Sequence, residues 1–217
     1  MSTSQQPDPL QRLSEALGSE YDQSRDAQRE RILGELDEVI ARVPEQTEFT
    51  NSRRFKVWGP VLTLFSLGLC VAGLYQGSTG LTVCGAVMVL VFALMTWQHR
   101  EAGQHVFMRL TRRQLIVDSL SAPVELADIM AIQVKDEGLV TQQKLMLTPT
   151  ATLPTHRARL QLFGNQAMAL KKPQPHICIH SAGLMTDGRK LSCAEIIDLL
   201  TAYRDAACAQ QQLDILR

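Results

Sequence analysis

The chain has 217 residues, of which 45% are hydrophobic, and its 22 Lys and Arg residues are matched by 22 Asp and Glu residues. A formal net charge of zero lacks the basic signature with which nucleic-acid-binding proteins contact phosphates, so we expect no nucleic-acid partner. The length allows one domain of ordinary size together with accessory segments.

The N-terminal part of the chain predicts a disordered end followed by helix. Residues 1–9 (MSTSQQPDP) are polar and rich in proline, which is typical of a disordered terminus. Residues 10–44 carry apolar residues at helical spacing and end at Pro44, which predicts an amphipathic helical segment. The apolar stripe of this helix is expected to be buried against one of three surfaces: the C-terminal domain, a second copy of this chain, or a partner protein. The candidate partner-binding residues are Ile32, Leu36, Val39 and Val43.

Residues 57–97 contain no Asp, Glu, Lys or Arg. Two apolar runs at 57–75 and 81–97 are separated by the turn-forming residues QGSTG. A helix needs about 20 apolar residues to cross the core of a bilayer, so the pattern predicts a transmembrane helical hairpin. Residues 45–56 are then expected to form a polar juxtamembrane linker. The alternative is a buried helical hairpin in a soluble protein.

Charged and aromatic residues at the ends of the two runs predict the orientation of the hairpin. Lys and Arg accumulate on the cytoplasmic side of a membrane, and Trp favours the headgroup level. We therefore expect a two-helix protein of the bacterial inner (plasma) membrane with both termini in the cytoplasm. The candidate membrane-interface residues are Trp58, Trp97, Arg53, Arg54, Lys56 and Arg100.

Small residues recur within the two apolar runs. They include Gly68, Ala72, Gly73 and Gly85. Small side chains let helix backbones approach closely in lipid, so they predict packing of the hairpin on itself, or contact with a transmembrane helix of another protein or of a second copy. No acid, base or His lies within the runs, which argues against a transporter or channel built on this hairpin alone.

Residues 104–209 have the length of one domain and alternate in the manner of short strands. Ser192 followed by Glu195 is a capping box, which predicts a final amphipathic helix over residues 192–208. Residues 210–217 are expected to form a tail after this helix. The expected strands cover residues 105–110, 114–119, 128–136, 144–148, 157–163, 166–171, 176–180, 183–186 and 189–191.

This run of strands, the position of the helix and the ending GLMTDGRKLS…EIIDLL resemble the bacterial PH-like domains that lie beside transmembrane hairpins in small membrane proteins. The resemblance covers roughly residues 104–209. It implies a membrane α+β protein with an N-terminal amphipathic helix, a two-helix transmembrane hairpin and a C-terminal PH-like barrel or sheet capped by a helix. It also implies a binding or scaffolding module. A small α+β sheet of another topology is the alternative.

Motifs that carry chemistry are scarce in this chain. The sequence has no phosphate-binding glycine loop, GxSxG, HExxH or CxxC, so we expect no catalytic residue, no cofactor and no enzymatic activity. The candidate metal ligands are His176, Cys178 and His180, which share one face of a strand and are ligand types for zinc or copper. The alternative is a strand whose isoleucines face the core. Arg157, Arg159, Lys171 and Lys172 are candidate contacts for lipid headgroups.

Three functions follow from these patterns. The first is an adaptor or scaffold whose domain and N-terminal helix bind a protein partner at the membrane. The second is an immunity protein that neutralises a toxin acting at the inner membrane. The third is a metal- or lipid-responsive membrane sensor. The expected partners are the lipid bilayer and a protein, with self-association as a homo-oligomer as a further interpretation of the apolar stripe and the small residues.

Overall fold

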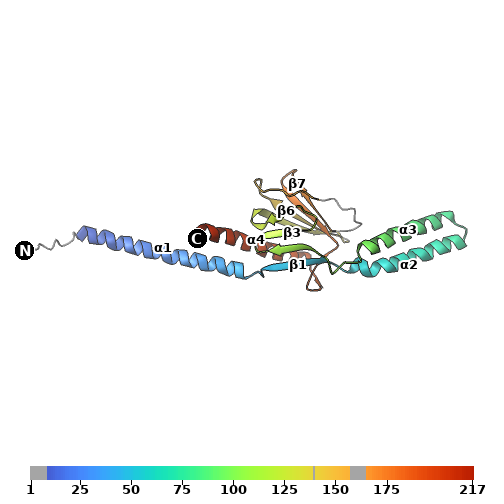
Figure 1. Cartoon of the computed structure of the whole chain (residues 1–217), viewed down its shortest axis with the longest axis horizontal. Coiled ribbons are helices and arrows are strands. Elements are labelled where there is room, and N and C mark those ends of the chain that lie inside the picture. The colour runs from blue at the N-terminus through green and yellow to red at the C-terminus, as the bar shows by residue number, and fades with distance from the viewer. Residues whose placement is uncertain (1–8, 139, 157–164) are drawn as a thin grey trace, which may run out of the picture.

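The computed structural model describes residues 9–138, 140–156 and 165–217. Over these residues it has four α-helices and ten strands. The strand predicted at 157–163 lies outside the described residues, together with Arg157 and Arg159. The predicted disordered segment also lies outside them, apart from Pro9. The molecule is elongated, with α1 projecting from one end of a central β-domain and the helices α2 and α3 from the other (Figure 1).

The ten strands form two antiparallel sheets. One has the strand order β10-β9-β1-β2-β3-β4 and the other the order β5-β6-β8-β7. A 3-10 turn, Leu126–Asp128, leads into the second sheet. The strands are β1 Gln46–Asn51, β2 Val106–Thr111, β3 Gln114–Val117, β4 Val124–Glu125, β5 Ile129–Asp136, β6 Thr141–Leu147, β7 Gln166–Leu170, β8 His176–Ser181, β9 Leu184–Thr186 and β10 Arg189–Lys190.

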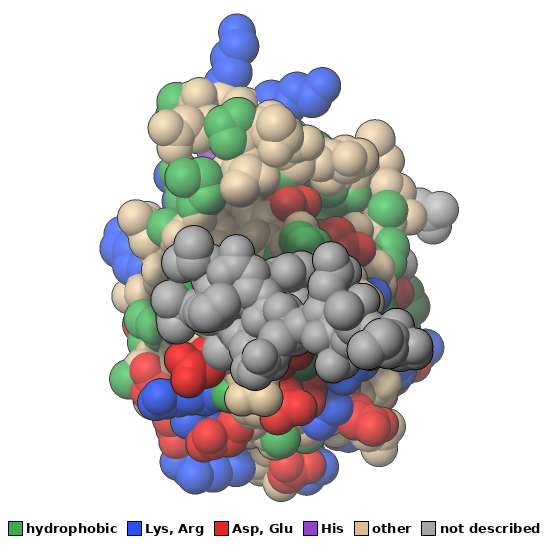
Figure 2. All heavy atoms as spheres, turned by 90° about the vertical axis from the view of Figure 1, so that its left-hand side faces the viewer, with side chains coloured by type: hydrophobic (Ala, Val, Ile, Leu, Met, Phe, Trp, Pro, Cys, Tyr) green, Lys and Arg blue, Asp and Glu red, His purple; other side chains and the backbone are tan. Residues whose placement is uncertain are grey.

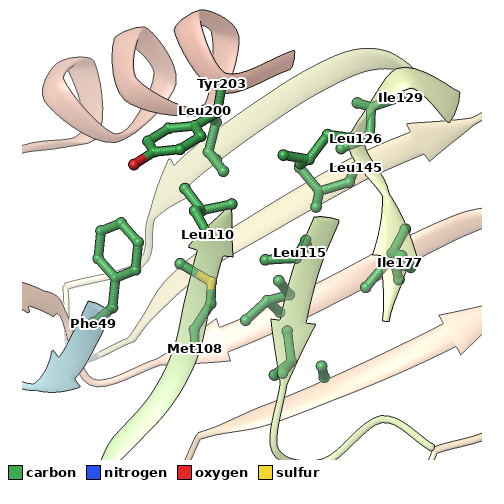
Figure 3. Packing of buried hydrophobic residues seen from close by; sticks show 14 of the residues in the cluster. Phe49, Met108, Leu110, Leu115, Leu126, Ile129, Leu145, Ile177, Leu200 and Tyr203 are labelled. Carbon is green, nitrogen blue, oxygen red and sulfur yellow. The ribbon is translucent and has the colours of Figure 1, made fainter. Parts of the chain in front are cut away.

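Buried apolar side chains from both sheets and from α4 (Cys193–Leu216) form one core. Phe49, Met108, Leu110 and Leu115 come from the first sheet, and Leu145 and Ile177 come from the second. Leu200 and Tyr203 of α4 close this core at one end (Figure 3). The helix predicted after the strands therefore covers the domain, because its apolar stripe faces the inner side chains of the sheets.

The expected linker at residues 45–56 is wrong. Residues 46–51 form β1, which lies between β9 and β2 in the first sheet. The register with β2 runs from Gln46 opposite Thr111 to Thr50 opposite Val106. The domain thus takes residues from both sides of the apolar runs and is not confined to 104–209. The two helices between β1 and β2 are an insertion between neighbouring antiparallel strands.

Helices α2 (Arg54–Tyr75) and α3 (Thr79–Gln98) form an antiparallel hairpin around the turn at Gly77, whose φ is +63°. A methyl group added at Gly85 would lie 2.6 Å from the backbone nitrogen of Cys70, and one added at Gly73 would lie 2.6 Å from that of Thr82. These glycines therefore let the two backbones touch, which confirms the predicted packing of the hairpin on itself at these positions. Gly68 faces open space instead.

The hairpin is joined to the domain without a free linker. The backbone N–H of Ser52 donates to the carbonyl oxygen of Gly183 at 3.0 Å, and the Ser52 hydroxyl donates to that of Ala182 at 2.8 Å. Ala182 in turn packs against the buried Met95 of α3. The turn between β8 and β9 is therefore seated on the end of the helical hairpin.

Helix α1 (Pro9–Ala41) packs on α4 through its C-terminal half. The predicted cap at the start of α4 is confirmed, and its hydrogen bonds, first the one from the backbone N–H of Ser192, lower the pKa of the Glu195 carboxyl. The tail expected at 210–217 is wrong, because α4 continues to Leu216. Ala206, Ala209 and Leu213 continue its buried stripe at helical spacing, so the helix has apolar contacts to its end.

Candidate functional site

The candidate metal ligands lie on β8, on the face opposite to Ile177 and Ile179 of the core. Cys178 Sγ lies 3.8 Å from His180 Nε2, and the Gln142 amide donates to Cys178 Sγ at 3.1 Å. His176 Nδ1 lies 2.7 Å from the Gln174 carbonyl oxygen. Within the described ranges no three His, Cys, Asp or Glu side chains are placed to hold a metal ion. Two of the three predicted ligands converge, while His176 is hydrogen-bonded to a loop.

The predicted membrane-interface residues gather where the hairpin meets the domain. Gly59 contacts Thr96, so the neighbouring Trp58 and Trp97 lie at the same end of the hairpin, with 57% and 63% of their surfaces exposed. The Arg100 guanidinium carbon lies 5.6 Å from the centre of the Trp97 ring. Three more cationic residues belong to this end: Arg53, which lies against Gly103, Arg54, which donates to the Gly138 carbonyl at 3.1 Å, and the exposed Lys56.

The apolar stripe of α1 is mostly used inside the molecule. Leu36 and Val39 are half-buried, and Val43, two residues beyond the end of α1, is only 4% exposed and belongs to the core. Of the three surfaces that the sequence analysis considered for burying this stripe, the C-terminal domain is the one that packs against this part of it. Ile32 remains exposed. The predicted partner-binding set therefore divides into three residues that hold α1 to the domain and one that faces outward.

The N-terminal half of α1 extends past the end of α4 (Figure 1). The Arg29 guanidinium donates to the Leu216 carbonyl, which marks where the contact between the two helices ends. Before this point Leu17 and Tyr21, four residues apart on one face, are 58% and 68% exposed. This protruding segment, residues 17–28, leaves two large apolar side chains without cover.

A cavity of about 330 Å³ lies between the end of α3 and the first sheet. Its described lining combines polar side chains with the buried Ala102, Phe107 and Val117 and includes neither Lys nor Arg, although Arg100 lies beside the lining residue Glu101. His105 Nε2 lies 3.2 Å from Asp118 Oδ2 in its wall. The described lining residues are Asn51, Gln98, His99, Glu101, Ala102, His105, Phe107, Val117, Asp118, Ser119 and Asn165.

Sequence reasoning missed this cavity because its polar residues come from segments that are far apart in the chain. Asn51 ends β1, Glu101 and His105 follow α3, and Asn165 precedes β7. No spacing or motif joins them. The nearest signal is the cluster of polar residues directly after the second apolar run, QHREAGQH at residues 98–105.

Comparisons with protein-family models, with curated proteins and with solved structures return no match. The function is therefore argued from the geometry of the chain itself.

Proposed function

We propose that this chain is a non-enzymatic, membrane-anchored adaptor that holds a protein partner at the cytoplasmic face of a bacterial inner membrane. The observation that carries the proposal is the insertion of the apolar hairpin between β1 and β2. An anchor built into a sheet fixes the position of the whole domain, because β1 directly before it and β2 directly after it are hydrogen-bonded to each other. A domain held in a fixed position relative to the membrane is well suited to present a binding surface to a partner.

The anchoring role is supported by the composition and exposure of the hairpin. Lys56–Tyr75 and Thr79–Gln98 are each long and apolar enough to cross a membrane, and most of their surface is not covered by the rest of the chain. Exposed apolar surface is unfavourable in water by about 25 cal/mol per Å². Lipid removes that cost, and the cations and tryptophans at the domain end of the hairpin match the headgroup region.

A PH-like fold for the domain is supported by two antiparallel sheets around one core, closed by the C-terminal helix. One fold can host many unrelated functions, so the fold alone does not name a ligand. The adaptor proposal therefore depends on a surface of this particular chain.

That surface is the protruding segment of α1. Leu17 and Tyr21 supply apolar contacts, and the segment carries Glu20, Asp22 and Asp26 against the single base Arg25. On the face seen in Figure 2, acidic and basic side chains are interspersed and neither sign forms a continuous patch. The proposed partner is a protein with an apolar groove flanked by Lys or Arg. A second copy fits less well, because its own acidic segment would lie against this one.

The test uses the full-length protein in its native membranes, with a photo-activated cross-linking residue in place of Tyr21. Gln23, on the opposite face of the helix, is the matched control position. We expect one stoichiometric adduct from position 21 and none from position 23. The double variant Leu17→Glu/Tyr21→Glu should abolish co-purification of that adduct's protein, whereas Gln23→Glu should not.

Two outcomes would overturn this surface. One is cross-linking to a second copy of the chain alone. The other is equal adduct formation from positions 21 and 23, which indicates collisions without a preferred face.

A further inference from the structure

Strands β6 and β8 bring a sulfur atom and two nitrogen atoms together on the face of the second sheet that is turned away from the core. Cys178 Sγ, His180 Nε2 and the Gln142 amide nitrogen lie between 3.1 and 3.8 Å from one another. We propose that Cys178 and His180 bind a cuprous ion, Cu(I), with the end of the Gln142 side chain at the third position around it.

The Gln142 amide shows where the lone pairs of the two ligands point. Its nitrogen lies 3.1 Å from Cys178 Sγ and 3.3 Å from His180 Nε2. An amide nitrogen only donates hydrogen bonds, so both partners must accept, and His180 then carries its ring proton on Nδ1. The sulfur and Nε2 thus direct lone pairs to one small region. A thiolate and an imidazole are ligand types that bind copper or zinc.

The separation of the two ligand atoms fits one shared ion. Bonds from a metal to a thiolate and to an imidazole are about 2.3 Å and 2.0–2.1 Å long. Because Cys178 Sγ lies 3.8 Å from His180 Nε2, an ion bound to both would have an angle of about 120° between its two bonds. This angle is trigonal and leaves a third position. The Gln142 amide lies beside both ligand atoms, and a half-turn of this group brings its oxygen to that position.

The surroundings favour a monovalent ion. The residues directly opposite Cys178 and His180 on the neighbouring strands are Lys144, Met168, Gln142 and Gln166. None of them is acidic. Cu(I) replaces the thiol proton of Cys178, which is released to solvent, so the charge of the site does not change. A zinc ion would add one positive charge beside Lys144, which is unfavourable. Met168 also offers a thioether, a soft ligand type that selects Cu(I).

Burial and hydrogen bonding separate these ligands from His176. Cys178 is 5% exposed, which shields a copper-bound thiolate from solvent, while the half-buried His180 gives the ion access. His176 Nδ1 lies 2.7 Å from the Gln174 carbonyl oxygen, which can only accept, so this ring nitrogen is a donor. His176 therefore lies on the same face of β8 without belonging to the site.

The test uses the full-length protein in detergent, titrated with Cu(I) under anaerobic conditions against the chromophoric chelator bicinchoninate. We expect the protein to take one Cu(I) per chain from the chelator and to retain no Zn²⁺ after gel filtration at the same metal concentration. X-ray absorption at the copper edge should show a three-coordinate ion with sulfur and imidazole nitrogen among its ligands.

The variants Cys178→Ser and His180→Ala should each weaken Cu(I) binding by more than about a hundredfold, since losing even an outer-shell partner of a metal ligand costs about 10–100-fold. His176→Ala and Cys193→Ser are the matched controls and should leave binding unchanged. His180 is half-buried, so its variant tests the site even where Cys178→Ser fails to fold.

Three results would overturn the proposal: no transfer of Cu(I) from the chelator, binding that is unchanged in His180→Ala, or retention of Zn²⁺ in preference to Cu(I). None of them bears on cross-linking through α1, so the copper site and the adaptor function fail separately.

Discussion

The hydroxyl of Tyr203 on α4 lies 2.7 Å from the hydroxyl of Thr47 on β1. The same phenol donates to the carbonyl oxygen of Pro44 at 3.1 Å, so the Thr47 hydroxyl is the donor to Tyr203. Tyr203 is fully buried. One side chain near the end of the chain therefore ties α4 to the segment that joins α1 to β1.

Replacing Tyr203 with Phe should lower the free energy of unfolding by about 1–3 kcal/mol. The ring remains, but the Thr47 hydroxyl and the Pro44 carbonyl lose their buried partner. Chemical denaturation in detergent, followed by near-UV circular dichroism, measures the change. Tyr21→Phe is the control, because Tyr21 is exposed on α1 and its substitution should leave the midpoint unchanged.

Stability should also depend on Tyr203 at alkaline pH. Burial, opposed by the hydrogen bond with Thr47, raises the pKa of its phenol above the ordinary value of 10.0. A raised folded-state pKa means that the contribution is complete below pH 10 and is lost as the pH rises through the folded-state pKa. The difference in unfolding free energy between wild type and Tyr203→Phe should therefore shrink above pH 10. A difference that stays constant to pH 11.5 would contradict this.

Much of this architecture could be predicted from the sequence, because several signals are local. The absence of charge in residues 57–97 predicts the helical hairpin, and Ser192 with Glu195 predicts the start of α4. Asp187 and Gly188 predict the β9–β10 turn, and both have positive φ in the structure, at 50° and 77°. Each signal lies within a few residues of the feature it determines.

The features that were missed depend on contacts between distant segments. Strand β1 has one buried residue, Phe49, and its pairing depends on β2 and β9, which follow the hairpin in the chain. Glu48 pairs with Arg109 across β1 and β2 at 2.8 Å, a contact that no local pattern shows. The cavity was missed for the same reason, because its lining residues Asn51 and Asn165 are far apart in the sequence and come together only in the folded chain.

The hairpin should be replaceable by a short turn. Thr50 pairs with Val106, so the ends of β1 and β2 already meet, and antiparallel neighbours need only about 2–5 residues to connect them. A chain in which a Gly-rich turn replaces residues 53–104 should be soluble without detergent and keep the amide cross-peaks of the core. Adding Phe49→Glu, which places a charge in that core, should abolish folding. Aggregation of the first chain would contradict an independent domain.

Gly85 and Gly68 should respond differently to the same substitution. Gly85→Ala forces a methyl group against the backbone of Cys70 and should destabilise the hairpin by about 1–3 kcal/mol. Gly68→Ala meets nothing within 4 Å and is the matched control. Thermal midpoints in detergent, read by the fluorescence of Trp58 and Trp97, compare the two. Equal midpoints would show that the helices do not approach at Gly85.

The turn of the hairpin should be accessible from the side of the membrane opposite to both termini. In a chain without other cysteines, Gln76→Cys should react with a membrane-impermeant maleimide added to intact spheroplasts. Gln23→Cys on α1 and Gln212→Cys on α4 should react only after lysis. Labelling of position 212 in intact spheroplasts, with position 76 protected, would invert the orientation.

The position of the hairpin also sets an order of events during synthesis. Strand β1 leaves the ribosome before α2 and α3, and both of its neighbours in the sheet, β2 and β9, are made after them. Closing a long flexible loop between β1 and β2 carries an entropic penalty that grows with its length. If the hairpin enters the bilayer as proposed, the pairing of α2 with α3 closes that loop and holds the strand ends together. Under that proposal, membrane insertion precedes the folding of the sheet, and β1 and β2 pair only after the anchor is in place.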